Sequence, residues 1–149
     1  YQARADLMWT ATLALNGITG AGLGKVGFPM HMIEHSLSAF YNVPHGAGLS
    51  AVIPGWMRFQ AKNRPERFAQ FSERVFGIRD GSIQERAAQG IELLSAWFTK
   101  VNSPVTITAL DIPAAEIPKI AQNALSLAKV WRMNDYDAEL IEEILNDCL

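Results

Sequence analysis

All three histidines of the chain, His31, His35 and His45, fall within one short stretch of the sequence. Imidazole is the commonest metal ligand in proteins and the one side chain that normally titrates near neutral pH. Nothing polar elsewhere in the chain is as concentrated as these three side chains. Their clustering predicts a single site, suited to binding a transition metal or to transferring protons.

Two helices and the turn between them must position these imidazoles. Pro29 suits the first turn of a helix over about residues 30–40, because its missing N–H is no loss there. The first two histidines are four residues apart on that helix, so they share one face. Residues 42–44 then break the helix before His45 opens the next one. This return can bring all three imidazoles into one pocket.

The same residues allow two other interpretations. The segment from His31 to His35 matches H-x-x-E-H, in which both histidines bind zinc and the glutamate, here Glu34, is the general base. A zinc metallopeptidase of this kind leaves His45 without a role, and Glu116 is its nearest downstream candidate for a third ligand. In the second alternative, a non-catalytic helical interaction domain, the histidines are structural residues with satisfied hydrogen bonds.

A glycine-rich segment precedes the histidines and contains G-x-G-x-x-G at Gly22, Gly24 and Gly27. A dinucleotide-binding turn needs this motif between a strand and a helix, with an acidic residue about 20 positions later. Here the motif follows a predicted helix, and residues 44–46 at that distance are Pro-His-Gly. We therefore predict a link between two helices and no cofactor-binding residues in this chain.

Helical patterns dominate the rest of the chain. Residues 2–16 are apolar nearly all round a helical wheel, which predicts a central helix buried on most sides. Ser82 and Glu85 form a predicted capping box, and Asp137 is the predicted N-cap of the last helix. The one β-like run, residues 103–110, is too short and isolated to build a sheet. The expected fold is all-α, with six to eight helices.

Composition limits the classes of function. A chain of 149 residues with 49% hydrophobic and 19% charged residues is one folded domain, and its net charge of -2 offers no basic field for nucleic acid or an anionic membrane. Charged or polar residues interrupt every apolar run before the roughly 18 residues of a spanning helix. Cys148, the single cysteine, allows no internal disulfide and is compatible with a cytoplasmic location.

The run from Met8 to Gly17, together with the pattern from His31 to Gly46, resembles the C-terminal helical domain of the iron-containing (group III) alcohol dehydrogenases. The similarity extends through nearly the whole chain and is greatest to the branch of butanol dehydrogenases and aldehyde reductases. It implies the multi-helix fold shared with dehydroquinate synthase-like proteins. Residues 1–149 are then a single metal-binding domain, and the N-terminal dinucleotide-binding domain is missing from this chain.

The resemblance also implies a role for each histidine. His31 and His45 match two of the family's three histidine ligands, while His35 matches a position that faces the nicotinamide and substrate. Glu34 is expected to be solvent-facing or structural. The remaining ligands, an aspartate and a histidine, should lie upstream of Tyr1. The implied ion is Fe(2+), although the ligand chemistry leaves Zn(2+) open.

The implied reaction is hydride transfer between NAD(P) and a small alcohol or aldehyde at the metal. NAD(P) would be bound mainly by the missing domain, so the 149-residue chain alone is expected to be inactive. We also expect His35 to donate or relay a proton, or to order water beside the nicotinamide. A homodimer is expected for the intact protein, with no nucleic-acid or membrane partner.

Overall fold

The computed structural model describes residues 1–24 and 26–149, and in these residues it contains helices and no strand. The all-α fold predicted from the sequence is therefore confirmed. The helices are α1 (Gln2–Leu15), η1 (Ile18–Gly20), α2 (Pro29–Tyr41), α3 (His45–Ala61), α4 (Pro65–Phe76), α5 (Ile83–Lys100), η2 (Thr108–Leu110), η3 (Ala114–Glu116), α6 (Ile117–Val130) and α7 (Ala138–Asn146).

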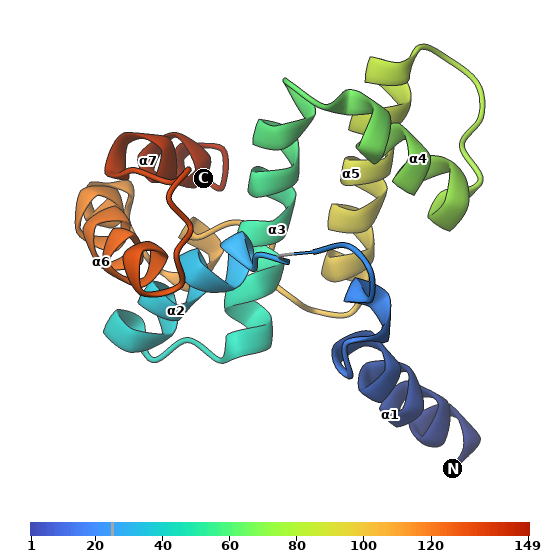
Figure 1. Cartoon of the computed structure of the whole chain (residues 1–149), viewed down its shortest axis with the longest axis horizontal. Helices are drawn as coiled ribbons and strands as arrows, with labels where there is room; N and C mark the ends of the chain where they lie inside the picture. Colours follow the sequence, from blue (N-terminus) through green and yellow to red (C-terminus); the bar gives the residue numbers. More distant parts are fainter. Residues whose placement is uncertain (25) are drawn as a thin grey trace.

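Helix α3 is the centre of the domain. It packs against α2 and α7 on one side and against α4 and α5 on the other, while α6 covers α2 and α7 (Figure 1). The main hydrophobic core lies where α2, α3, α6 and α7 meet. Among its fully buried members are Met32, Leu37, Val52, Ile120, Ile141 and Ile144. This core fixes the relative positions of α2 and α3, the two helices that carry the histidines.

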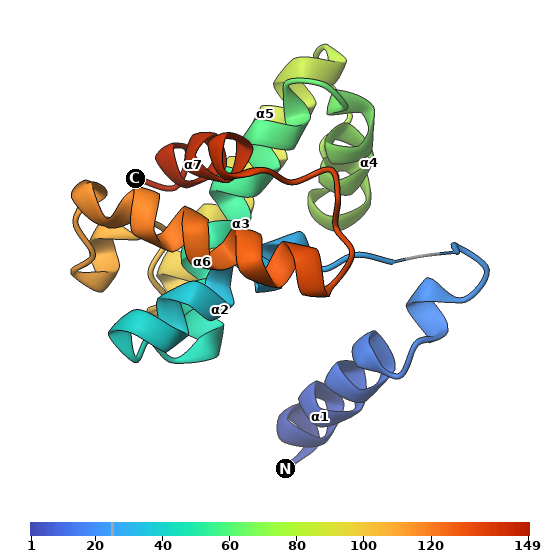
Figure 2. The same ribbon diagram turned by 60° about the vertical axis from the view of Figure 1, so that its left-hand side comes forward.

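Helix α1 does not occupy the predicted central position. None of its residues is buried, and the side chains of Leu7, Met8 and Trp9 are 64–72% exposed. It projects away from the other helices in both views (Figures 1 and 2). The prediction of a buried central helix was wrong, because an apolar surface all round a helix requires covering partners and the described part of the chain supplies none.

The predicted helix caps are confirmed. Ser82 Oγ accepts a hydrogen bond from the Glu85 amide at 3.2 Å, and the Glu85 carboxylate accepts one from the Ser82 amide at 2.8 Å. The hydrogen bonds that the Ser82 amide and then the Ser82 hydroxyl donate to the Glu85 carboxylate lower the pKa of that carboxyl. At the start of α7, Asp137 Oδ1 accepts from the Leu140 amide at 2.8 Å. Residues 103–110 form no strand and end in the short turn η2.

The glycine-rich segment follows α1 and the turn η1, so the strand that a dinucleotide-binding turn requires does not precede it. Gly22 and Gly24 adopt positive φ angles of 79° and 76°, a conformation that favours glycine. Lys25, inside the predicted link, lies outside the described residues. Among the residues that are described, no helix has both the length and the apolar character to cross a membrane.

Candidate metal centre

A tight turn between α2 and α3 brings the histidines together. Pro29 occupies the first turn of α2, as predicted, and Asn42 ends the helix in the left-handed conformation with φ 53°. The Asn42 amide still donates to Ser38 O at 3.1 Å, and the Ser38 hydroxyl lies 2.9 Å from Val43 O. These contacts fix the short connection, after which α3 begins at His45.

The three imidazoles converge as the sequence predicts. The ring centroids of His31 and His45 are 5.2 Å apart, and those of His35 and His45 are 5.6 Å apart. Each of the other two rings makes a T-shaped aromatic contact, His31 with Phe28 and His35 with Trp131, and in each pair the centroids are 5.4 Å apart. The ring of His45 therefore contacts both of the others.

The environments of the three rings differ. His35 is exposed, the His45 side chain is 50% exposed and His31 is half-buried. Burial lowers the pKa of His31, and the neighbouring His45 and His35 lower it further. A lowered pKa keeps this imidazole neutral at pH 7, which is the form that binds a metal.

His31 also has an unpaired buried atom. Within the described residues, its Nδ1 has no hydrogen-bond partner although it is buried. Buried polar atoms are nearly always paired, so an orphaned ring nitrogen indicates a partner that lies outside these residues. The neutral imidazole of His31, beside that of His45, fits part of the coordination sphere of an iron or zinc ion.

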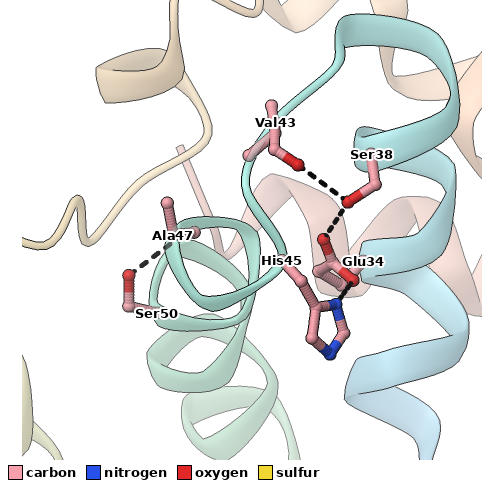
Figure 3. A network of polar contacts seen from close by, with 6 residues as sticks. All are labelled: Glu34, Ser38, Val43, His45, Ala47 and Ser50. Carbon is pink, nitrogen blue, oxygen red and sulfur yellow. Dashed lines mark hydrogen bonds and ion pairs between the residues drawn. The ribbon is translucent and has the colours of Figure 1, made fainter.

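Glu34 departs from one of its two expected roles. Its side chain is fully buried, so the solvent-facing interpretation is wrong and the structural one stands. One carboxylate oxygen, Oε2, pairs with His45 Nδ1, and the other, Oε1, lies 2.5 Å from the Ser38 hydroxyl (Figure 3). One feature of the sequence could have indicated this arrangement. Glu34 falls within the run of core residues on α2, and a buried carboxylate needs a polar or charged partner.

A second grouping of ligand atoms overlaps the predicted one. Atoms of Glu34, His35 and His45 all lie within 4.8 Å of one another, as they would in a metal site. His31 is not in this group, although the resemblance makes it a ligand. In this grouping, however, Glu34 is already paired with His45 and is closed off from solvent. We therefore retain His31 and His45 as the predicted ligands.

Two residues that the peptidase interpretation requires, a general base and a third metal ligand, are engaged in other contacts. A general base must reach a water molecule, but the Glu34 carboxylate is buried and paired. Glu116, its candidate third ligand, accepts hydrogen bonds from Tyr41 Oη at 2.6 Å and Lys119 Nζ at 3.0 Å. Burial, followed by this bond to Glu116, raises the pKa of Tyr41 to about 12.

Comparisons with known proteins identify the family of the chain. The model of the Fe-containing alcohol dehydrogenase family, C-terminal, matches residues 1–149. The probable NADH-dependent butanol dehydrogenase 1 of Bacillus subtilis is 32% identical over the whole chain, which spans 39% of that relative. The NADPH-dependent aldehyde reductase YqhD of Escherichia coli is 31% identical over 80% of the chain and 31% of its own length.

Solved structures show the same fold. The crystal structure of NADH-dependent butanol dehydrogenase A from Thermotoga maritima superposes with a TM-score of 0.89 at 36% identity, covering 99% of this chain and 39% of the other. For YqhD of Escherichia coli the TM-score is 0.88 at 26% identity, covering 100% of this chain and 38% of the other. The resemblance predicted from the sequence is confirmed. The chain belongs to the Fe-containing alcohol dehydrogenase family and has the fold of its C-terminal domain.

Proposed function

We propose that the intact protein is a metal-dependent, NAD(P)-linked alcohol dehydrogenase or aldehyde reductase, and that residues 1–149 supply part of its metal centre. The observation that carries the proposal is the convergence of His31, His35 and His45 in a chain whose whole length matches this family. Similar proteins carry the names butanol dehydrogenase and aldehyde reductase, so small alcohols and aldehydes are the proposed substrates.

In this proposal His31 and His45 bind the ion, which is Fe(2+) or, by the same ligand chemistry, Zn(2+). When bound, the ion supplies Lewis acidity toward the oxygen of the alcohol or aldehyde. An aspartate and a histidine upstream of Tyr1 complete its ligands. NAD(P) is bound mainly by an N-terminal domain, so residues 1–149 alone neither bind it tightly nor catalyse the reaction. A cytoplasmic location and a homodimer stay predictions for the intact protein.

Removing the metal tests the function directly. The intact protein should reduce butyraldehyde with NADH or NADPH, lose this activity on exhaustive treatment with a chelator, and recover it with Fe(2+) or Zn(2+). The rate of nicotinamide oxidation, followed by absorbance, gives the result, with metal content measured on the same samples. Undiminished turnover by metal-free protein would contradict the proposal, and so would a purified protein with neither metal nor turnover.

His35 is the proposed proton donor or water-ordering residue. Its ring is exposed, lies beside His45 and makes a T-shaped contact with Trp131, so it is held in place yet accessible. We expect His35→Ala to lower kcat by at least about 10²-fold, the lower range for loss of a general acid. The pH dependence of kcat should flatten, and metal content should stay at the wild-type value.

The same variant separates this role from that of a ligand. Metal content and pH profile are measured on one preparation of the His35→Ala protein and compared with the wild type. A variant that loses its metal together with its activity would show that His35 binds the ion, as in the grouping with Glu34 and His45. That result would overturn the proposed role.

A further inference from the structure

The environment of Glu34 suggests a function beyond filling the core. Its carboxylate is fully buried between α2 and α3, yet it contacts His45, whose ring contacts both other histidines. Burying a carboxylate costs free energy unless charged or polar partners compensate it. Its partners here are His45 Nδ1 and the Ser38 hydroxyl.

The bond to Glu34 determines which nitrogen of His45 is available. A ring nitrogen that faces a carboxylate carries the proton, because the carboxylate oxygen accepts a hydrogen bond. Nδ1 is then the donor, and the lone pair resides on Nε2. In Figure 3 Nε2 lies on the side of the ring opposite Glu34. Glu34 thus selects both the tautomer and the direction of the imidazole.

Close packing on two sides fixes the position of the Glu34 side chain. Gly48, one turn after His45 on α3, packs so closely that a Cβ there would lie 2.5 Å from Glu34 Oε1 and 2.7 Å from its Cγ. On the other side, the hydroxyl of Ser38, one turn after Glu34 on α2, lies 2.5 Å from Glu34 Oε1 and 2.9 Å from Val43 O. The carboxylate therefore lies between the Gly48 backbone, which can come close because glycine has no side chain, and the Ser38 hydroxyl.

We propose that Glu34 is a positioning residue that holds the His45 imidazole with Nε2 directed toward the metal, and that Gly48 is required to make room for it. This inference rests on the proposed metal centre. Carboxylates that orient metal-binding histidines in this way contribute substantially to metal affinity without touching the ion. The H-x-x-E-H pattern then has a different meaning from that in peptidases, because its glutamate acts through a histidine eleven residues away.

Metal affinity of the intact protein, measured by competition of Zn(2+) with a chelator, tests the proposal. Glu34→Gln keeps the size of the side chain and removes its charge, and we expect about 10- to 100-fold weaker binding. Gly48→Ala, whose added Cβ would meet Glu34 first, should weaken binding by a similar factor. The matched control is Gly46→Ala, since a Cβ at Gly46 meets no atom within 4 Å and should leave affinity unchanged.

A double-mutant cycle distinguishes positioning from direct ligation. If Glu34 acts through His45, Glu34→Gln should have little further effect on the residual affinity of the His45→Ala variant. Wild-type affinity in Glu34→Gln would overturn the proposal, as would a full additional loss in the His45→Ala background. If the wild-type protein binds no metal, the proposed function fails. If the wild type binds and turns over normally while Glu34→Gln is unaffected, only this inference fails.

Discussion

His45→Ala and His31→Ala, each made in the intact protein, should remove tightly bound metal and nearly all activity. Each substitution deletes an imidazole from a site in which the number of ligands sets most of the affinity. A metal's stabilisation of developing charge amounts to several kcal/mol, so kcat/KM should fall by about 10³-fold or more. Elemental analysis of the purified variants gives the metal content, and nicotinamide absorbance gives the rate.

The chain provides a matched control for these two variants. His35→Ala is the same chemical change within the same cluster, and we expect it to retain the metal. Thermal unfolding of metal-free samples shows whether each variant is folded. Unchanged metal stoichiometry in both His31→Ala and His45→Ala, with wild-type stability, would contradict their assignment as ligands.

Ile144→Ala should produce the largest loss of stability among these variants. Ile144 is fully buried in α7, within the core shared by α2, α3 and α6. Truncating a buried isoleucine removes its transfer free energy and leaves a cavity, so the free energy of unfolding should fall by about 2–5 kcal/mol. Urea denaturation followed by circular dichroism measures this difference.

Glu143→Ala is the control for Ile144→Ala, because Glu143 is the preceding residue on α7 and is exposed. Exposed substitutions away from special contacts usually change stability by less than about 0.5 kcal/mol. Equal stability of the two variants would show that α7 is not packed into the core as the structure has it.

The elements that carry the site follow from local sequence signals. Pro29 starts α2, Asn42 ends it with a positive φ, and His45 starts α3. Backbone preferences alone therefore predict two helices joined by a tight turn. The caps at Ser82 and Asp137 are equally local. Such signals depend on residues within one turn of each other, which is why they can be recognised without knowledge of the tertiary structure.

Other features depend on contacts between distant segments. The all-round apolar pattern of α1 predicts a covered helix but does not identify what covers it. The burial of Glu34 depends on how closely α3 packs against α2. Glycine at position 48 allows this close packing because it has no side chain. In the same way, a Cβ at Gly55 would lie 2.3 Å from Cys148 Sγ, a packing contact between residues far apart in sequence. Helical periodicity contains no information on such close approaches.

We propose that His31 and His45 bind one metal ion while the Glu34 carboxylate holds the His45 ring through Nδ1. Anomalous diffraction at the metal absorption edge, from crystals of the intact metal-loaded protein, tests it most directly. We expect an anomalous peak within coordinating distance of a ring nitrogen of His31 and of His45 Nε2, with Glu34 on the Nδ1 side. A peak enclosed by Glu34, His35 and His45, with His31 out of reach, would contradict it.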